Sequence, residues 1–254
     1  MDITVLIITY NEEPNIDRVL AKLFGFTRVI LLDSGSTDKT LEIASKYSNV
    51  EVVYRKFDTF AGQCNFGLSL IHSEWTLSLD ADYVLTDTFI QEITNHIHSA
   101  SSNQIVGYSV GFKFCVFGKP LRGDNTTPRI VLFKTKLGNY IDDGHAHRLS
   151  IEGNIHDVKS YILHDDRKDL TRWFLNQNSY SIREAHKLLH TPKEELRLTD
   201  KLRKLKWLAP ILVFFHCLFI KGLILDGWHG WHYTLQRTMV EIMFCLRLIE
   251  EEKM

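Results

Sequence analysis

The sequence predicts an α/β fold, in which helices flank a mostly parallel sheet and a helical segment follows at the C-terminus. Three observations support this prediction. Short β-branched or leucine-rich runs alternate with runs of helical periodicity through roughly the first hundred residues. The expected strands are apolar on both faces, as in sheets that are covered on both sides. Beyond about residue 190 the chain changes character and carries basic and aromatic stretches.

The expected elements follow one another in a regular order. Strands are expected over residues 3–9, 28–33, 50–55 and 75–80, and helices over residues 15–24, 37–47 and 60–72. This alternation implies right-handed crossovers between parallel strands. In open sheets of this kind, ligands bind beyond the carboxyl ends of the strands. A functional site is therefore expected where these strands end.

Composition restricts the class of protein. A chain of 254 residues allows one large domain, or a domain with an appendage. The 30 basic and 31 acidic residues nearly cancel, so nucleic acid is not expected as a partner. The four cysteines form no C-x-x-C pair, which argues against a zinc site and fits a reducing compartment. The N-terminus lacks the basic region of a signal peptide, so a cytoplasmic location is the expectation.

Polar clusters follow three of the expected strands. Their members lie directly at strand ends: Thr9, Tyr10, Asn11 and Glu12 after the first, Asp33 at the end of the second, and Asp80, Ala81 and Asp82 at the end of the fourth. A helix capping box and a turn are structural alternatives for the first two clusters, and a D-x-D sequence also arises by chance. Three such clusters together nevertheless indicate a ligand site. Two carboxylates one residue apart are suitable ligands for a divalent cation on a diphosphate.

Both glycine-rich phosphate loops are absent from the sequence. Neither G-x-G-x-x-G nor G-x-x-x-x-G-K-[ST] occurs, which argues against nicotinamide dehydrogenases and P-loop kinases. A nucleotide would then be held by side chains and a metal ion.

These motifs, in this order and at this spacing, resemble those of the family 2 glycosyltransferases of GT-A fold. The matching pieces are residues 9–12, 33–38, Gln63-x-Asn65-x-Gly67 and 80–82. A second set, residues 142–145, 164–168 and 225–230 with Trp173, Gln177 and Tyr180, resembles the bacterial β-1,4-glucosyltransferases of the lipopolysaccharide inner core. The resemblance implies an inverting, metal-dependent enzyme that moves a hexose, glucose from UDP-glucose, to a saccharide acceptor such as that core. It also implies a GT-A domain over residues 1–190 and a membrane-associating helical segment over residues 191–254.

The resemblance implies a role for each matching residue. The residues expected to bind the nucleotide sugar are Thr9, Tyr10, Asn11, Glu12, Asp33, Gly35, Ser36, Gln63, Asn65, Asp80, Ala81 and Arg167. Within this set, Asp33 is expected to pair with the uracil edge. Asp82, Asp80 and His164 are expected to hold Mg²⁺ or Mn²⁺ against the diphosphate. A structural histidine and a solvated charged turn are the alternatives for His164 and Arg167.

Inversion at the anomeric carbon requires a general base that takes the proton of the acceptor hydroxyl. Asp143 is the first candidate, with Asp142 and His147 behind it. Many family members carry a His-Glu pair here, whereas this chain has His147 followed by Arg148. A tight turn at Asp143 and Gly144 is the structural alternative.

The C-terminal segment has a membrane-like composition. Residues 197–206 contain five basic residues and one acid, and residues 207–221 are apolar and aromatic except at Pro210, His216 and Lys221. This pattern favours an interfacial helix on anionic lipid, with a true span and a buried helix or subunit contact as alternatives. Residues 232–250 have helical periodicity and are expected to pack on it. With a glycolipid acceptor, the expected location is peripheral, on the cytoplasmic face of the inner membrane.

Two other functions compete with this interpretation. Sugar-nucleotide pyrophosphorylases share the alternating architecture and the metal carboxylates, but they carry a glycine-rich, arginine-bearing loop where this chain has Thr9 to Glu12. A non-catalytic, membrane-docked protein of GT-A fold is the second alternative. Such a protein would not need the carboxylates of a metal site.

Overall fold

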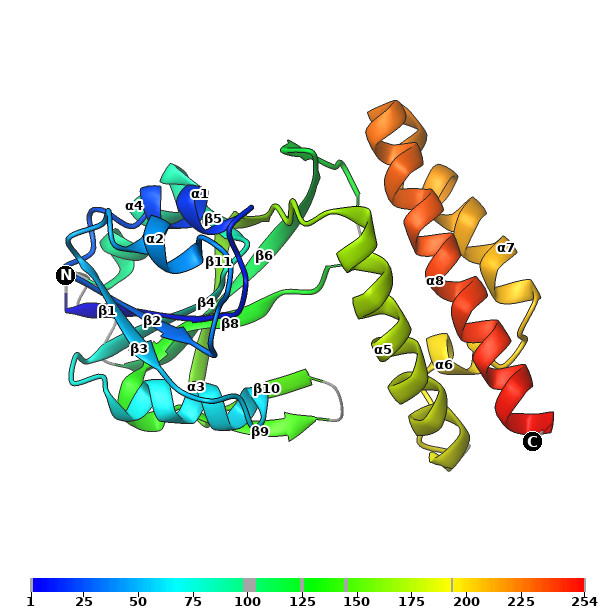
Figure 1. The fold of residues 1–254 in the computed structure, drawn as a ribbon, viewed down its shortest axis with the longest axis horizontal. Coiled ribbons are helices and arrows are strands. Elements are labelled where there is room, and N and C mark those ends of the chain that lie inside the picture. Colours follow the sequence, from blue (N-terminus) through cyan, green and yellow to red (C-terminus); the bar gives the residue numbers. More distant parts are fainter. Residues whose placement is uncertain (1, 98–103, 124–125, 144–145, 193, 254) are drawn as a thin grey trace. The chain divides into compact units, whose positions relative to one another are not determined.

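The structure is a computed structural model that describes residues 2–97, 104–123, 126–143, 146–192 and 194–253 (Figure 1). The chain forms two compact units. The first comprises Met1–Cys115 with Thr126–Arg167, and the second comprises Val116–Asn125 with Lys168–Met254. Each unit is described by itself below. The domain boundary expected after residue 190 stays a prediction.

The first unit is built on a large mixed sheet. Its strands are β1 (Ile3–Thr9), β2 (Arg28–Asp33), β3 (Val50–Tyr54), β4 (Trp75–Asp80), β5 (Tyr83–Leu85), β6 (Ile105–Val116), β8 (Arg129–Lys134) and β11 (Asn154–His164). They lie in the order β3-β2-β1-β4-β8-β6-β11-β5. The first four pair in parallel, β8 is antiparallel to β4 and β6, and β11 is parallel to β6. Strands β9 (Asn139–Asp143) and β10 (Ala146–Ser150) form a separate antiparallel hairpin.

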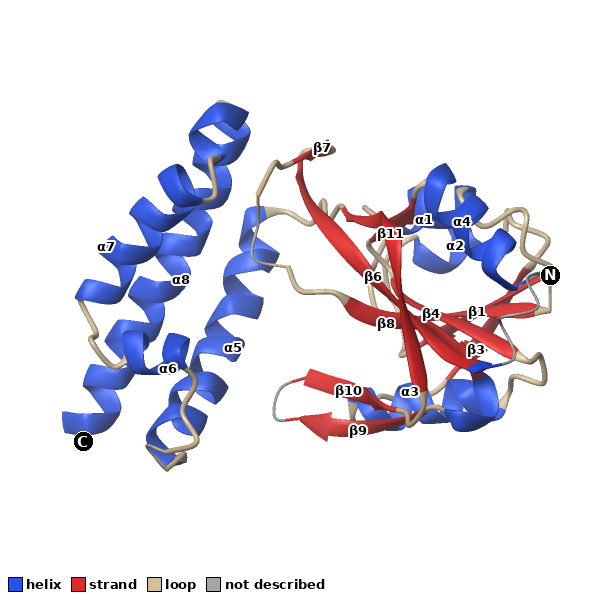
Figure 2. Cartoon of the chain, turned by 180° about the vertical axis from the view of Figure 1, so that it is seen from behind, coloured by secondary structure: helices blue, strands red, loops and turns tan. Residues whose placement is uncertain are grey.

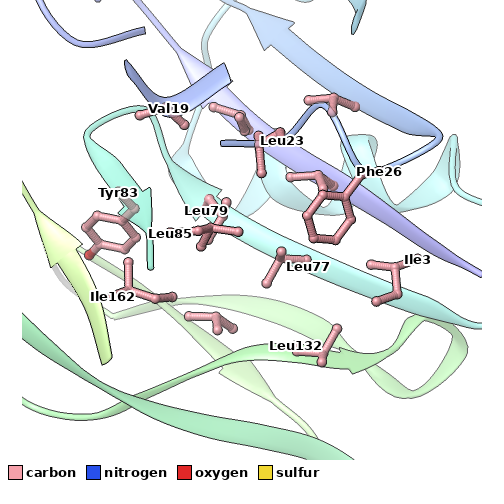
Figure 3. Packing of buried hydrophobic residues seen from close by; sticks show 14 of the residues in the cluster. Ile3, Val19, Leu23, Phe26, Leu77, Leu79, Tyr83, Leu85, Leu132 and Ile162 are labelled. Carbon is pink, nitrogen blue, oxygen red and sulfur yellow. The ribbon is translucent and has the colours of Figure 1, made fainter. Parts of the chain in front are cut away.

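Helices cover both faces of this sheet (Figure 2). On one face lie α1 (Ile16–Ala21), α2 (Thr40–Ala44) and α4 (Asp87–Ile97), and on the other lies α3 (Phe60–Ser69) beside the β9–β10 hairpin. Side chains alternate along a strand. Ile3, Val5 and Ile7 of β1 therefore enter the core that includes residues of α1 and α4, whereas Leu6 packs with α3. Figure 3 shows Ile3 in this core together with Val19 of α1.

The α/β prediction is confirmed. Strands β1, β2 and β4 have the expected bounds, and β3 ends one residue earlier than expected. Helix α3 begins where the Thr59 hydroxyl accepts a hydrogen bond from the backbone N–H of Gly62 at 2.9 Å, which caps its first turn. The helices are shorter than the apolar periodicity suggests, because their last predicted residues form turns.

The second unit is mainly helical. It contains β7 (Lys119–Pro120), α5 (Leu170–His190), α6 (Leu198–Arg203), α7 (Leu208–Phe215), the π-turn η3 (His216–Ile220), the 3₁₀ turn η4 (Leu223–Asp226) and α8 (Trp228–Lys253). Helix α8 packs against both α5 and α7. Pro210 lies in the first turn of α7, where its missing N–H would have no helical partner. None of the helices within the described residues is both long enough and apolar enough to cross a bilayer.

Candidate active site

The three polar clusters meet at one edge of the sheet. Thr9 of β1 pairs with Asp33 of β2, and Ile8 of β1 pairs with Asp80 of β4. The carboxyl ends of β2, β1 and β4 therefore stand side by side at the same level. This register brings Asp33 and Asp80 to the two sides of the loop that follows Thr9, which is where ligands bind in sheets of this kind.

The loops after β1 and β2 are joined by Asn11. Its backbone N–H donates to the Ser36 hydroxyl at 2.8 Å, and its side-chain oxygen accepts from the Thr37 N–H at 2.7 Å. Asn11 has a φ of 54°, in the left-handed region that asparagine tolerates better than most residues. The next residue, Glu12, donates its N–H to the Thr40 hydroxyl at 2.7 Å. The two loops consequently form one continuous rim over the strand ends, with Tyr10 half exposed on it.

Asp33 organises its own loop. Its side chain is buried, and Oδ2 accepts the backbone N–H groups of Gly35 at 2.8 Å and Ser36 at 2.9 Å, while Oδ1 accepts the Ser36 hydroxyl. Gly35 has a φ of 102°, which favours glycine at this position. A carboxylate offers about four acceptor positions. These three bonds leave capacity for one further donor, so the expected pairing of Asp33 with a base edge stays a prediction.

The Gln63-x-Asn65-x-Gly67 motif lies along α3 and makes internal contacts. Gln63 is buried and donates to the backbone oxygen of Arg55 at 3.0 Å. Asn65 donates to the Tyr140 oxygen and accepts the Tyr140 N–H, both at 2.8 Å. Gly67 lies so close to Leu6 that a Cβ would collide with its side chain. The motif therefore fixes α3 against β1 and ties it to β9.

Asp80 ends β4, Asp82 follows it, and His164 ends β11 beside them. His164 pairs in register with Tyr83, so its imidazole Nε2 lies 3.3 Å from Oδ2 of Asp82. Burial lowers the pKa of His164, but the charges of Asp82 and Asp80 outweigh it and raise the pKa overall. Within the described parts of the chain, no three His, Cys, Asp or Glu side chains are grouped as around a metal ion.

Arg129 is a site residue that the sequence did not indicate. It begins β8, and its guanidinium Nη1 lies 3.8 Å from Oδ2 of Asp80 and donates to the Tyr83 hydroxyl at 3.0 Å. The side chain is mostly exposed. An arginine at the start of an apolar strand matches no sequence motif. Only the antiparallel placement of β8 beside β4 reveals that Arg129 lies near the D-x-D sequence.

Asn15 is a second unpredicted residue. It is fully buried, and its amide donates to Glu12 Oε2 at 2.8 Å and to Asp166 Oδ1 at 2.9 Å. Its side-chain oxygen accepts the Arg167 N–H at 2.8 Å, which fixes the segment after β11 against the start of α1. The Arg167 guanidinium lies 2.9 Å from Asp165. The expected contact of Arg167 with phosphate stays a prediction.

The candidate bases lie on the β9–β10 hairpin. Asp142 pairs in register with His147, and Asp143 pairs with Ala146. The Asp142 side chain is exposed. The side chains of Asp143 and His147 and the whole of residues 144–145 lie outside what the structure describes. The choice among the three candidates therefore stays a prediction.

The large mixed sheet with its flanking helices is that of glycosyltransferases of GT-A fold. Residues 4–151 match the family model described as glycosyl transferase family 2. This match covers more than half of the chain. The protein therefore belongs to glycosyl transferase family 2, as the resemblance implied.

Several relatives span nearly the whole chain, and two of them are described here. The lipopolysaccharide core biosynthesis glycosyltransferase LpsC of Rhizobium meliloti is 26% identical over 238 residues, which cover 91% of this chain and 85% of LpsC. An uncharacterized glycosyltransferase of Rickettsia conorii is 25% identical over 244 residues, which cover 90% of this chain and 83% of that relative.

Solved structures share the fold at low identity. The mannosyltransferase PcManGT from Pyrobaculum calidifontis, in complex with GDP-Man and Mn²⁺, is similar with a TM-score of 0.54 and 14% identity over 99% of this chain and 87% of that one. The S. aureus protein TarS 1-349 in complex with UDP-GlcNAc has a TM-score of 0.51 and 16% identity over 100% of this chain and 91% of that one.

Proposed function

We propose that the protein transfers a hexose from a UDP-sugar, UDP-glucose in the first instance, to a saccharide acceptor with inversion at the anomeric carbon. The observation that carries this proposal is the register of β2, β1 and β4, which aligns Asp33, Thr9 and Asp80 along one edge of the sheet. In this proposal the rim joined by Asn11 holds the base and the ribose. Tyr10 on the rim is half exposed, and the proposal assigns it a contact with the base.

Asp82 and His164 fit a divalent cation. A carboxylate and an imidazole 3.3 Å apart offer one oxygen and one nitrogen ligand. Mg²⁺ is typically held by one or two carboxylates and by substrate phosphates, so two protein ligands are sufficient. Bound Mg²⁺ or Mn²⁺ would neutralise the charge of the departing diphosphate. Asp80 and Arg129, 3.8 Å apart, would then contribute to the same region from β4 and β8.

The acceptor would be activated by the hairpin that carries Asp143. A carboxylate there takes the proton of the acceptor hydroxyl while the hydroxyl oxygen attacks the anomeric carbon. Asp142 and His147 are the alternative bases. The two hydrogen bonds between Asn65 and Tyr140 hold β9 against α3 and so fix the position of this hairpin within the first unit.

The acceptor we propose is the saccharide of a glycolipid, the lipopolysaccharide inner core. LpsC, whose name refers to lipopolysaccharide core biosynthesis, aligns with 91% of this chain, and this supports the proposal. Such an acceptor would place the enzyme at the cytoplasmic face of the inner membrane.

One assay separates this function from its alternatives. Purified protein is incubated with UDP-glucose and Mn²⁺, with and without lipopolysaccharide core acceptor, and the products are resolved by chromatography. Acceptor-dependent release of UDP supports the proposal. Formation of UTP on addition of pyrophosphate would instead indicate a pyrophosphorylase, and binding without any turnover would indicate a binding protein. A panel of nucleotide sugars in a thermal shift assay then ranks the donors, because a bound ligand stabilises the folded state.

A further inference from the structure

The second unit exposes large apolar side chains where α7 passes into α8. We call six of them the apical cluster: Phe117, Phe219, Ile220, Leu225, Trp228 and Trp231, which are 42 to 76% exposed. They come from the β6–β7 turn, from η3 and η4, and from the first turn of α8. The elements η3, η4 and α8 contact one another, and Phe117 lies with its ring centroid 5.5 Å from that of Trp228. The cluster is therefore one continuous surface.

Phe117 occupies an unusual backbone conformation. It and Gly118 form the two-residue turn between β6 and β7, and both have positive φ, 49° and 82°. Such turns favour Asn-Gly or Gly-Gly, because a bulky residue is strained in the left-handed region. Here the strained position carries a phenylalanine that is 67% exposed. Its ring packs against the rings of Trp228 and His232, with centroids 5.5 and 5.3 Å away, so the strained position places an exposed aromatic side chain within the apical cluster.

The charges around the apical cluster have one sign. Segments 116–123 and 207–240 contain four basic residues, Lys119, Arg122, Lys221 and Arg237, and a single acid, Asp226. Asp226 is buried, accepts the backbone N–H of Arg122 at 2.9 Å, and lies 3.3 Å from the Arg122 guanidinium. No exposed carboxylate belongs to these segments within the described residues. Arg122 is paired with Asp226, and Arg237 lies 3.7 Å from the buried Glu241, so the cationic character of the rim comes mainly from Lys119 and Lys221.

We infer that the apical cluster docks on an anionic lipid bilayer. Tryptophan, phenylalanine and aliphatic side chains partition into the interfacial region, and Lys119, Arg122 and Lys221 would lie against the headgroups. A second copy of the chain fits less well, because a two-fold interface would bring this cationic rim against itself without carboxylates. The inference rests on the proposed function in one respect: a glycolipid acceptor requires the enzyme to work at a membrane surface.

Two of the five cations in the basic stretch that the sequence suggested for this task, Arg203 and Lys206, form ion pairs with acids of α8. Arg203 lies 3.1 Å from Glu241, which is 3% exposed, and Lys206 forms an ion pair with Glu252. These two cations join α6 and its following turn to α8. We therefore place the docking surface at the apical cluster, and a contribution of residues 197–206 to membrane binding stays a prediction.

The test is sedimentation of the full chain with vesicles of phosphatidylcholine, alone or mixed with phosphatidylglycerol, at low and high salt. The apical variant is Phe117→Gly combined with Ile220→Ser. Glycine relieves the strain at position 117, so loss of binding cannot be attributed to misfolding of the turn. The matched control is Leu235→Ser combined with Leu246→Ser, which replaces two exposed residues of α8 outside the apical cluster. Calorimetric affinity for UDP is measured for every variant.

We expect the wild type and the control to bind vesicles that contain phosphatidylglycerol, with a blue shift of tryptophan emission, and the apical variant to bind about tenfold more weakly or worse. UDP affinity should be equal in all three. Binding of the apical variant to the phosphatidylglycerol vesicles with the same strength as the wild type would overturn the inference. Failure of the wild type to bind vesicles while it turns over donor would overturn it too, and would leave the proposed function intact. A dimer that the apical variant converts to monomers would also overturn it, in favour of a second copy.

Discussion

The side chain of Asn65 and the backbone of Tyr140 exchange two hydrogen bonds of 2.8 Å each. Asn65 lies on α3, and Tyr140 lies on β9, two residues before Asp142. The hairpin that carries the candidate bases is thereby fixed to the helix that covers β1 and β2. We therefore propose that Asn65 positions the hairpin toward the acceptor, while the contact with the donor that the sequence suggested stays a prediction.

Replacing Asn65 with alanine should therefore lower kcat more than it changes donor affinity. Loss of both bonds leaves two backbone groups of Tyr140 without these partners, which costs about 1–3 kcal/mol of stability. A shift of the hairpin by about 1 Å can reduce the rate of transfer on the order of 10²-fold. Steady-state kinetics and UDP calorimetry check this split. Weakened UDP binding at unchanged kcat would instead return Asn65 to the donor site.

Asp33→Ala should weaken UDP binding by about 1–3 kcal/mol and reduce discrimination against GDP, because one acceptor for the base edge is lost. The carboxylate also holds its loop, so a control must loosen the same loop in another way. Asp38→Ala serves, since Asp38 accepts the N–H groups of Glu13 at 3.1 Å and Thr40 at 3.0 Å. Equal losses in the two variants would show that Asp33 is only a loop residue.

Much of the first unit could be predicted because its sequence patterns are local. Strands β1, β2 and β4 are buried on both faces by helices, so each appears as an uninterrupted apolar run with recognisable ends. Strand β6 mixes buried and partly exposed residues without a regular alternation, and in β11 only Val158 and Ile162 are buried. Their pairing depends on contacts between residues far apart in the sequence, which local hydrophobic periodicity cannot predict.

The candidate site likewise contains residues that the local sequence identified and residues that it did not. Asp33 and Asp80 end apolar strands, and this position identified them. Asn15 and Arg129 act through partners far along the chain, Asp166 and Asp80, so nothing in their neighbourhoods distinguished them. Likewise, a count of basic residues in 197–206 could not reveal that Arg203 and Lys206 are matched by Glu241 and Glu252.

The pairing of Arg203 with Glu241 leads to a stability prediction. Burial lowers the pKa of Arg203, but the charge of Glu241 outweighs this effect and raises it, as expected for a close ion pair. Arg203→Glu places two carboxylates together and should destabilise the helical unit by about 3–5 kcal/mol. Lys204→Glu, at the neighbouring position, should change stability by less than about 0.5 kcal/mol. Chemical denaturation followed by circular dichroism compares them, and equal stability of the two variants would be inconsistent with a structural ion pair.

The base can be identified by isosteric substitution. Asp143→Asn preserves the shape of the side chain and removes its proton acceptor, so kcat should fall about 10²–10⁴-fold while UDP affinity stays nearly unchanged. Asp142→Asn and His147→Ala are measured beside it. An active Asp143→Asn enzyme together with an inactive His147→Ala enzyme would make the histidine the base.

The most direct measurement concerns Asp82, which lies 3.3 Å from His164 and is proposed to hold the metal ion. Transfer from UDP-glucose is compared in the presence of Mn²⁺ for the wild type, for Asp82→Asn and for Asp87→Asn, a control on α4 whose side chain is 85% exposed. The proposal predicts that Asp82→Asn loses transfer on the order of 10²-fold or more together with the Mn²⁺ dependence of UDP affinity, at an unchanged melting temperature. Asp87→Asn should retain full activity. An Asp82→Asn enzyme that turns over within about twofold of the wild type would remove the D-x-D carboxylates from the mechanism.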